Sequence, residues 1–253
     1  MTHILITGAS SGIGEALAER YAAPGITLSL IGRDPARTDD VARRCEARGA
    51  RVAAVCIDVE DSASLAAWIS ARDGLEALDL VVANAGISAG TGGGGESAEQ
   101  TRRIFAVNVT GVFNTVLPAI DVMRPRRRGQ IAIMSSVAGF RGLRSAPAYC
   151  ASKAAVRVWG EGLRGMLAPD NISVSVICPG FVESRMTAVN CFHMPFLMDT
   201  PRAAAIIARG LAARRGRISF PWPMAALTWM LAALPDAIAG PLTARVPGKP
   251  ATG

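Results

Sequence analysis

Short, almost wholly apolar segments alternate with helical patterns along this chain, and no other feature constrains its fold as strongly. Strands are predicted at residues 3–7, 27–31, 51–57, 78–83, 131–134 and 173–178. Strands without a polar face are typical of a parallel sheet that helices cover on both sides. Because crossovers between parallel strands are right-handed, the sequence predicts an α/β fold with a doubly wound parallel sheet.

Helical patterns fill the intervals between the predicted strands. They cover residues 13–21, 36–48, 62–72 with Ser62 as its cap, 108–123 and 149–167, and another helix begins near Pro201. The glycine run Gly92–Gly95 is interpreted as a loop beside the site. No linker divides the chain, so we expect one three-layer α/β/α domain of Rossmann type over residues 1–253.

The charge of the chain carries little functional information. The net charge is +7, but almost all basic residues are arginine, which indicates a GC-rich genome. The arginines are spread along the chain without interleaved aromatic residues, so we expect no nucleic-acid partner, while attraction to an anionic cofactor or lipid stays open. Five cysteines without regular spacing and no visible leader favour a reduced, cytoplasmic protein. The two histidines lack metal-ligand spacing, so no metal is expected.

A glycine-rich turn joins the first predicted strand to its helix. The segment Thr7 to Gly14 has the spacing G-x-x-x-G-x-G. Glycines allow a sharp turn and bring the backbone close to a pyrophosphate, which meets the positive end of the helix dipole. Tight packing alone could also require such a turn, but its place between strand and helix favours a dinucleotide site. The expected cofactor contacts are Gly8, Ser10, Ser11, Gly12, Ile13 and Gly14.

The end of the second predicted strand indicates which dinucleotide binds. Sites that prefer NAD usually place an acid here for the ribose 2′-hydroxyl, whereas an arginine accommodates a 2′-phosphate. Gly32 stands where the acid would be, and Arg33 follows it. Asp34 is expected to begin the next helix, where a negative charge is favourable. The sequence therefore predicts NADP(H) in preference to NAD(H).

Tyr149 and Lys153 lie four residues apart in a helical pattern and therefore share a face. An ammonium beside a phenol favours the ionised phenol, and such a pair can exchange a proton with an alcohol or ketone. Tyr-x-x-x-Lys is a weak signal by itself. It carries more weight here because the chain has only two tyrosines and two lysines.

The chain resembles the short-chain dehydrogenase/reductase family. It is most similar to the branch whose members are about 250 residues long and carry Tyr-x-x-x-Lys. The resemblance covers roughly residues 3–185. The matching motifs are Thr7-Gly8-x-x-x-Gly12-x-Gly14, Asp58-Val59, Asn84-Ala85-Gly86, Asn108, Ser135-Ser136, Tyr149-x-x-x-Lys153 and Pro179-Gly180.

The resemblance implies four catalytic residues. Tyr149 matches the general acid/base, and Lys153 matches the lysine that lowers the tyrosine's pKa and binds the nicotinamide ribose. Ser136 matches the serine that positions the substrate oxygen, and Asn108 the asparagine of a proton relay through water. Ser135 is expected to serve only as a hydrogen-bonding residue at the end of a strand, and Cys150 as a small residue packed on its helix.

The resemblance also implies cofactor contacts beyond the glycine turn and Arg33. Asp58 matches the residue that binds the adenine amino group, and Asn84 supports the central strands near the adenosine ribose. Ser184 matches the hydroxyl residue that contacts the carboxamide. Tyr149 and Lys153 are included among the cofactor-binding residues, and the others are Val59, Ala85, Gly86, Pro179, Gly180 and Val182.

The last third of the chain departs from the family pattern. Residues 185–200 are apolar and rich in methionine, which predicts a loop over a hydrophobic substrate. Residues 218–253 differ from the usual tail, which favours a homodimer over a tetramer. Pro221 and Pro223 are expected to delay the apolar helix there until Met224. That helix is too short to span a bilayer. A helix over the cleft or in an interface is slightly favoured over one on a membrane surface.

Two functions are compatible with these residues. The favoured one is an NADP(H)-preferring enzyme that interconverts a lipophilic ketone and a secondary alcohol. The alternative is a non-catalytic NADP(H)-binding sensor or partner subunit with the same fold. The presence of all four residues Asn108, Ser136, Tyr149 and Lys153 favours the enzyme.

Overall fold

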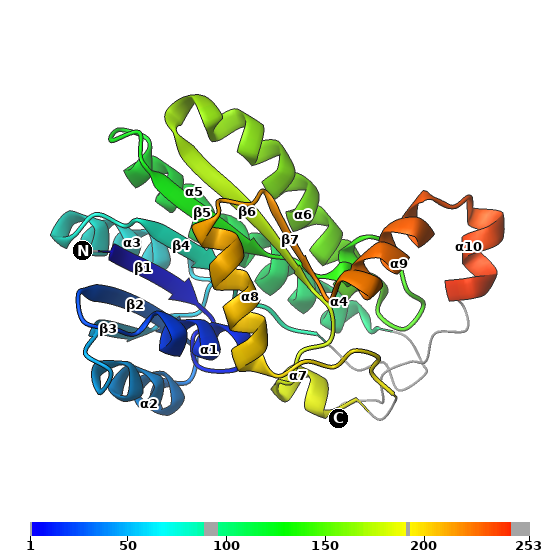
Figure 1. The fold of residues 1–253 in the computed structure, drawn as a ribbon, viewed down its shortest axis with the longest axis horizontal. Coiled ribbons are helices and arrows are strands. Elements are labelled where there is room, and N and C mark those ends of the chain that lie inside the picture. The colour runs from blue at the N-terminus through cyan, green and yellow to red at the C-terminus, as the bar shows by residue number, and fades with distance from the viewer. Residues whose placement is uncertain (1, 89–95, 191–192, 244–253) are drawn as a thin grey trace.

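The structure, a computed structural model, describes residues 2–88, 96–190 and 193–243 (Figure 1). The predicted glycine loop Gly92–Gly95 lies outside these residues. In the described part of the chain, seven parallel strands form one sheet in the order β3-β2-β1-β4-β5-β6-β7. The strands are β1 (Thr2–Thr7), β2 (Ile26–Gly32), β3 (Arg51–Cys56), β4 (Leu80–Ala83), β5 (Gly129–Met134), β6 (Ile172–Pro179) and β7 (Arg217–Phe220). The predicted doubly wound sheet of a single Rossmann-type domain is confirmed.

Helices cover both faces of the sheet, and each face has its own apolar core. On one face lie α1 (Gly12–Tyr21), α2 (Pro35–Glu46) and α8 (Thr200–Ala212). On the other face lie α3 (Ser62–Leu75), α4 (Ala98–Phe105), α5 (Gly111–Met123) and α6 (Pro147–Leu167). The strands β1, β2, β4, β5 and β6 between these layers are mostly buried, as their apolar sequences require, whereas the edge strand β3 has no buried residue.

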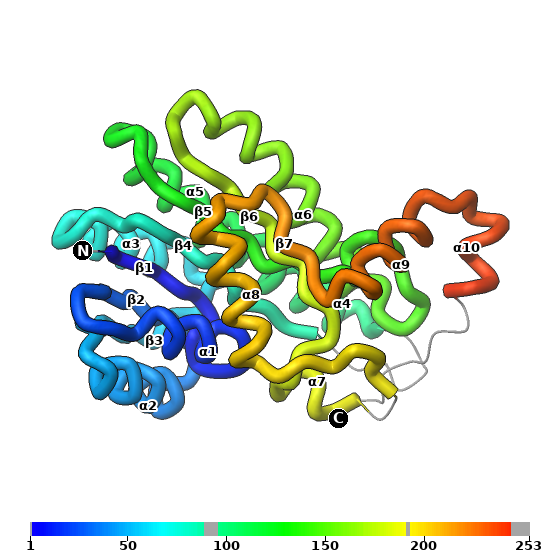
Figure 2. Tube along the Cα trace, viewed as in Figure 1, coloured from blue at the N-terminus to red at the C-terminus, as the bar shows by residue number. Residues whose placement is uncertain are grey.

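The chain order places the carboxyl ends of β1 and β4 side by side at the centre of the sheet. The strands before this point are added on one side of β1, and the later strands on the other (Figure 2). Ligands of open α/β sheets bind in the crevice that such a reversal creates outside the carboxyl ends of the strands. Thr7 and Ala83 end β1 and β4 at this position.

A π-helical segment, Ala106–Thr110, joins α4 to α5 and was not predicted. Together they form the helical run Ala98–Met123, which is long and apolar enough to cross a membrane, although half of its most apolar window is buried inside the protein. This burial is typical of a core helix. Single π turns within helices often occur at functional sites, and this one contains Asn108.

The structure corrects three local predictions. The N-cap of α3 is Asp61, whose carboxylate accepts a hydrogen bond from the Ser64 N–H at 3.0 Å, and not Ser62. The edge strand β7 was not predicted in the divergent segment, because only four residues pair there. The last long apolar helix, α9 (Trp222–Ala233), begins before Met224, because a proline is tolerated in the first turn of a helix.

The C-terminal helices α9 and α10 (Asp236–Thr243) extend away from the body of the molecule (Figure 1). Met224 is the buried residue of α9, whereas Trp222 and Trp229 are 78% and 60% exposed. Arg214 and Arg215 precede β7, at the far end of that strand from α9. Arg217, the first residue of β7, is paired with Glu161 at 2.5 Å.

Candidate active site

The glycine turn after β1 is shaped by its glycines. Gly8 and Gly12 have φ of +66° and +60°, which side chains disfavour. A Cβ added to Gly14 would lie 2.2 Å from the Gly8 carbonyl oxygen. No side chain therefore covers the backbone of the glycine turn. The free N–H groups of the first turn of α1 are exposed there. These residues fit the pyrophosphate of a dinucleotide.

Asn84 holds the glycine turn against the end of β4. Its side-chain amide donates to the carbonyl oxygens of Thr7 and Gly8, at 3.0 and 3.2 Å. Thr7 Oγ1 accepts hydrogen bonds in return from the backbone of Asn84 and Ala85. Asn84 thus joins the ends of β1 and β4, and its place near the adenosine ribose stays a prediction. Two residues after Asn84, Gly86 makes room for Asn108 and Lys153. A Cβ on Gly86 would lie 3.2 Å from Asn108 Oδ1 and 3.2 Å from Lys153 Nζ.

Arg33 and Asp58 meet at the carboxyl ends of β2 and β3. Arg33 Nη1 lies 3.8 Å from Asp58 Oδ2, and both side chains are more than a third exposed. Asp34 is the N-cap of α2, as predicted, and accepts a hydrogen bond from the Arg37 N–H at 3.0 Å. A Cβ on Gly32 would lie 2.1 Å from Thr38 Oγ1, so the buried Thr38 occupies the volume that an acid at this position would need.

Helix α6 brings Tyr149 and Lys153 to one face, beside the strand end that carries Ser136. A hydrogen bond joins the side chains of Ser136 and Tyr149. Ser136 Oγ also accepts from the Ala138 N–H at 3.1 Å and donates to the Pro179 carbonyl at 3.3 Å. The Lys153 ammonium lies 5.8 Å from the centroid of the Tyr149 ring and donates to the Met134 carbonyl at 3.0 Å. The sequence therefore identified three side chains that the fold places together.

Burial shifts the pKa values of both ionisable groups. It raises the pKa of Tyr149 to about 12, although the hydrogen bond with Ser136 acts in the opposite direction. It lowers the pKa of Lys153 to about 8, because the charged form loses hydration. The sequence analysis expected the ammonium to favour the phenolate. Here desolvation of the phenol prevails, and the Lys153 ammonium is directed to a carbonyl oxygen.

Asn108 is fully buried and fixes the middle of the site. Its amide oxygen accepts from the Ile87 N–H at 2.8 Å, and its amide nitrogen donates to Ile87 O at 2.9 Å and to Ser152 Oγ at 3.0 Å. Ser152 Oγ in turn donates to the Tyr149 carbonyl at 2.8 Å. Asn108 is thus linked to Tyr149 through Ser152, a residue that the sequence analysis missed because one buried serine on a helix has no pattern.

Ser135 and Cys150, to which the sequence analysis gave structural roles, lie beside the catalytic residues. Ser135 Oγ donates to the Lys153 carbonyl at 2.8 Å, as expected for a hydrogen-bonding residue at the end of a strand, and Cys150 is buried on α6. Glu96 was missed. Its carboxylate accepts hydrogen bonds from the N–H groups of Ala148 and Tyr149 and so caps the first turn of α6.

The segment after β6 closes the site from the other side. Gly180 N–H donates to the Phe220 carbonyl at 2.7 Å, and a Cβ on Gly180 would lie 2.7 Å from Met224 Sδ of α9. Val182 pairs with Met198, which joins the two ends of the predicted substrate loop. Ser184 caps the short helix α7 (Arg185–Ala188). It lies opposite Gly12, because a Cβ added to Gly12 would lie 3.3 Å from Ser184 Cβ. Val59 is buried against Gly111.

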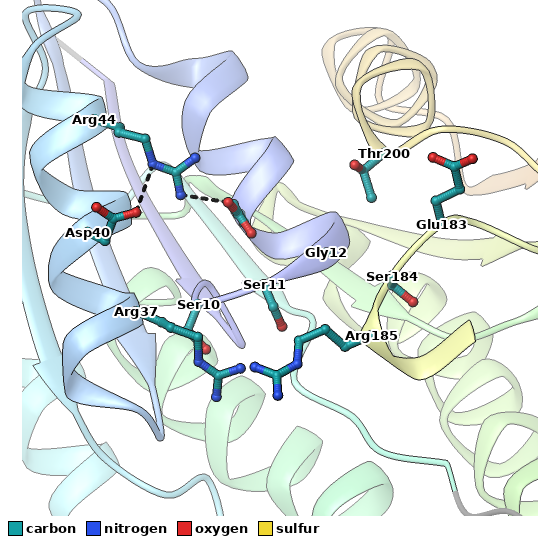
Figure 3. Close-up of a pocket in the computed structure, with 11 residues that line it drawn as sticks. Ser10, Ser11, Gly12, Arg37, Asp40, Arg44, Glu183, Ser184, Arg185 and Thr200 are labelled. Carbon is teal, nitrogen blue, oxygen red and sulfur yellow. Dashed lines mark hydrogen bonds and ion pairs between the residues drawn. The ribbon is translucent and has the colours of Figure 1, made fainter. Parts of the chain in front are cut away.

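A cleft of about 310 Å³ opens beside the glycine turn (Figure 3). It extends from the first turn of α1 to α2 on one side and to α7 on the other. The residues around it include three arginines that the sequence analysis did not assign: Arg37, Arg44 and Arg185. Among the described residues, no group of three histidines, cysteines or acids is placed to hold a metal ion.

Comparison with known proteins agrees with this geometry. The family model for short chain dehydrogenases matches residues 2–191. An uncharacterized oxidoreductase of Myxococcus xanthus is 39% identical over 92% of this chain and 92% of its own length. A short-chain dehydrogenase of Sphingobium yanoikuyae in complex with NADPH is 27% identical with a TM-score of 0.82 and covers 98% of this chain and 97% of its own.

A third similar protein is a short chain dehydrogenase/reductase of Burkholderia phymatum in complex with NAD. It is 26% identical with a TM-score of 0.80, over 90% of this chain and 91% of its own. The solved relatives thus bind NADPH in one case and NAD in another. The glycine turn, the Ser136, Tyr149 and Lys153 cluster and these matches lead to one assignment: the chain belongs to the short-chain dehydrogenase/reductase family of oxidoreductase enzymes.

Proposed function

We propose that this enzyme uses NADP(H) to interconvert a lipophilic ketone and its secondary alcohol. The observation that carries the proposal is the hydrogen-bonded pair Ser136 and Tyr149, beside the buried Lys153, at the carboxyl edge of the sheet next to the glycine turn. A hydroxyl pair can bind one carbonyl oxygen from two directions and pass a proton to it. A protein that only binds a dinucleotide does not need a proton donor at this place, which is why we favour the enzyme over the non-catalytic alternative.

The chain's own residues supply the proton and the binding of the oxygen. When NADPH is bound, its nicotinamide supplies the hydride for the carbonyl carbon. Ser136 donates a hydrogen bond to the carbonyl oxygen, and Tyr149 gives that oxygen its proton. A pKa of about 12 keeps the phenol protonated at neutral pH, which suits a proton donor in reduction. Lys153, whose ammonium lies 5.8 Å from the centroid of the Tyr149 ring, would hold the ribose, as the family resemblance implies.

The preference for NADP(H) rests on two features at the end of β2. Arg33 offers an exposed guanidinium, held loosely by Asp58 at 3.8 Å. Thr38 fills the space in which an acid on residue 32 would have to lie. The first feature favours a 2′-phosphate and the second disfavours recognition of the 2′-hydroxyl by an acid.

The preference for a lipophilic substrate rests on the segment after β6. Val189, Phe196 and Leu197 of the predicted substrate loop are 44%, 57% and 41% exposed. Helix α9 packs its Met224 against Gly180 and also contacts the turn after Ser136. These apolar side chains belong to the segments that follow β6 and β7, and their chemistry suits a hydrophobic ligand.

A panel of straight-chain ketones, assayed with NADPH and with NADH, tests this proposal. We expect kcat/KM to rise with chain length and to be at least about tenfold higher with NADPH, the effect of one charged contact. In the Arg33→Ala variant, the ratio of kcat/KM with NADPH to kcat/KM with NADH should fall most of the way to one. Equal activity on short polar and long ketones would contradict the substrate class, and an unchanged cofactor ratio in Arg33→Ala would contradict the role of Arg33.

The raised pKa of Tyr149 predicts opposite pH dependences for the two directions. Alcohol oxidation needs the phenolate, so its kcat/KM should rise about tenfold per pH unit between pH 6 and 7.5. Ketone reduction uses the phenol, which stays protonated throughout this range, and should be nearly flat. Steady-state pH profiles in both directions measure this. A steep fall in reduction over the same interval would show that the proton donor is another group.

We also propose a homodimer formed through α5 and α6. Leu117 on α5 and Val158 and Met166 on α6 are apolar and between 50% and 57% exposed. Burying these side chains between two copies would remove them from water. Light scattering after size exclusion should give the mass of two chains. The Val158→Glu variant should shift the measured mass toward that of one chain. An unchanged mass would contradict this interface.

A further inference from the structure

Helix α6 carries Tyr149 in its first turn but has no capping side chain of its own at this end. Its first residue, Pro147, lacks an N–H group, and its N-cap, Ala146, makes no side-chain hydrogen bond. The N–H groups of Ala148 and Tyr149 come next, and the first turn of a helix provides no backbone acceptor for them. An acceptor for them has to come from outside the helix.

Glu96 supplies this acceptor from the segment that precedes α4. One oxygen of its carboxylate accepts the Ala148 N–H, and the other accepts the Tyr149 N–H at 3.4 Å. The next residue, Ser97, is the N-cap of α4 and forms a capping box with Gln100, which fixes the backbone beside Glu96. One carboxylate thus joins the turn that carries Tyr149 to the capped start of a neighbouring helix.

Few of the described residues around Tyr149 are ionisable. On α6 these are Cys150, its neighbour, and Lys153, whose ammonium lies 5.8 Å from the centroid of the phenol ring. Strand β6 adds Cys178, which lies near Lys153. Strand β5, the π-helical segment and the turn after Ser136 also pack against α6, and none of the three has an ionisable side chain. The charged residues of α4 and of the loop before α6 are exposed or paired elsewhere: Glu99, Arg102, Arg103, Arg141 and Arg144. This leaves the carboxylate bonded to the first turn with little competing charge.

A negative charge at this turn favours the protonated form of Tyr149. The unpaired N–H groups at the start of a helix amount to a partial positive charge, which favours the ionised form of a nearby phenol. A carboxylate bonded to the same N–H groups offsets that charge. Burial raises the pKa of Tyr149 to about 12, and the charge of Glu96 acts in the same direction as burial. In the proposed function the phenol must be protonated, because it gives its proton to a ketone.

We propose that Glu96 is a positioning residue for proton transfer by Tyr149, which fixes the first turn of α6 and offsets the positive charge of its end. The inference rests on the proposed function, because the role of Tyr149 comes from there. Glu96 acts through the backbone of Tyr149 and not on the substrate. Its two effects can be separated, because an amide in place of the carboxylate keeps an acceptor oxygen but carries no charge.

Titration of the Tyr149 phenol tests the charge without any turnover. In the Tyr21→Phe background Tyr149 is the chain's only tyrosine, so one Cζ carbon-13 resonance reports its ionised fraction by NMR. The fraction is compared at the highest pH that leaves the circular dichroism of the protein unchanged. In Glu96→Gln it should be about twofold to fivefold higher than with Glu96 present, the effect of one charge at a helix end. Glu99→Gln is the matched control, an exposed acid three residues further along, and should leave the fraction unchanged.

The kcat for ketone reduction tests the positioning. Glu96→Ala leaves the Ala148 and Tyr149 N–H groups without their acceptor, so the phenol is held less precisely. The kcat should fall about tenfold, whereas KM for NADPH should change less than about twofold. Glu96→Gln keeps an acceptor and should stay within about threefold of the wild-type kcat. Asp61→Ala removes the cap of α3, a helix that carries none of the four catalytic residues, and should not lower kcat.

Three results would overturn the proposal. An unchanged ionised fraction in Glu96→Gln would show that the carboxylate exerts no charge on the phenol, and a normal kcat in Glu96→Ala would show that it does not position Tyr149. An equal loss of kcat in Glu96→Ala and Asp61→Ala would indicate a general effect of a lost cap. Failure of the proposed function is recognised separately, because the wild-type enzyme would then reduce no ketone of the panel. The titration would still support or contradict the charge effect of Glu96.

Discussion

Replacement of Tyr149 by phenylalanine is expected to lower kcat for ketone reduction about a thousandfold, within the range found for loss of a general acid. The hydroxyl is the only group removed, and the ring that packs beside Lys153 remains. The KM for NADPH should therefore change little. Stopped-flow absorbance of NADPH with a reactive ketone measures the rate, and a fluorescence titration measures cofactor binding.

Tyr21 provides the matched control for this variant. It is the chain's other tyrosine, its pKa is also raised to about 12 by burial, and it ends α1 at the opposite edge of the sheet from the site. Tyr21→Phe should leave kcat within about twofold, because its hydroxyl has no role in proton transfer. A similar loss in both variants would indicate a general effect on the fold, and normal turnover in Tyr149→Phe would contradict the catalytic assignment.

Replacement of Gly14 by alanine is expected to cost about 2 to 3 kcal/mol of stability and most of the affinity for NADPH. The new methyl group would lie 2.2 Å from the Gly8 carbonyl oxygen and 2.6 Å from Asn84 Nδ2. Both atoms belong to the bonded network that shapes the turn, so relief of the clash must displace the turn itself. Urea unfolding measures the stability, and titration with NADPH measures the affinity.

Gly74 on α3 separates this clash from a general effect of alanine on helices. No atom lies within 4 Å of a Cβ at Gly74, and the residue is exposed. Gly74→Ala should therefore stabilise the protein by about 0.5 to 1 kcal/mol, because alanine loses less backbone entropy in a helix. NADPH binding should not change. A Gly14→Ala protein with normal stability and affinity would show that the turn can move without consequence.

Much of the fold was predictable because its signals are local. Each buried strand is a run of apolar residues, and caps such as Asp34 occur at helix starts. The exceptions have tertiary causes. Strand β7 is held by its pairing with β6 and not by its own pattern, and the π turn at Asn108 arises inside a continuous helical sequence. Helix α9 begins at Trp222 because Pro223 needs no backbone donor in the first turn.

The site was predictable where residue types recur at fixed spacing, as in the glycine turn and in Tyr149 and Lys153. Residues that act through a single long-range contact gave no such signal. Glu96 caps α6 across 52 residues of sequence, and Arg185 faces Arg37 only in the folded chain. The direction of the Tyr149 pKa shift was also missed, because helical spacing shows which groups share a face but not how deeply each is buried.

Transfer of a labelled hydride tests the central claim most directly. The enzyme would be incubated with a ketone from the panel and with NADPH that carries deuterium at the transferred position of the nicotinamide. We predict that the alcohol product contains one deuterium at the carbinol carbon, detected by mass spectrometry, and that Tyr149→Phe forms it about a thousandfold more slowly. An alcohol without deuterium, or unchanged formation of the labelled alcohol in Tyr149→Phe, would contradict the account.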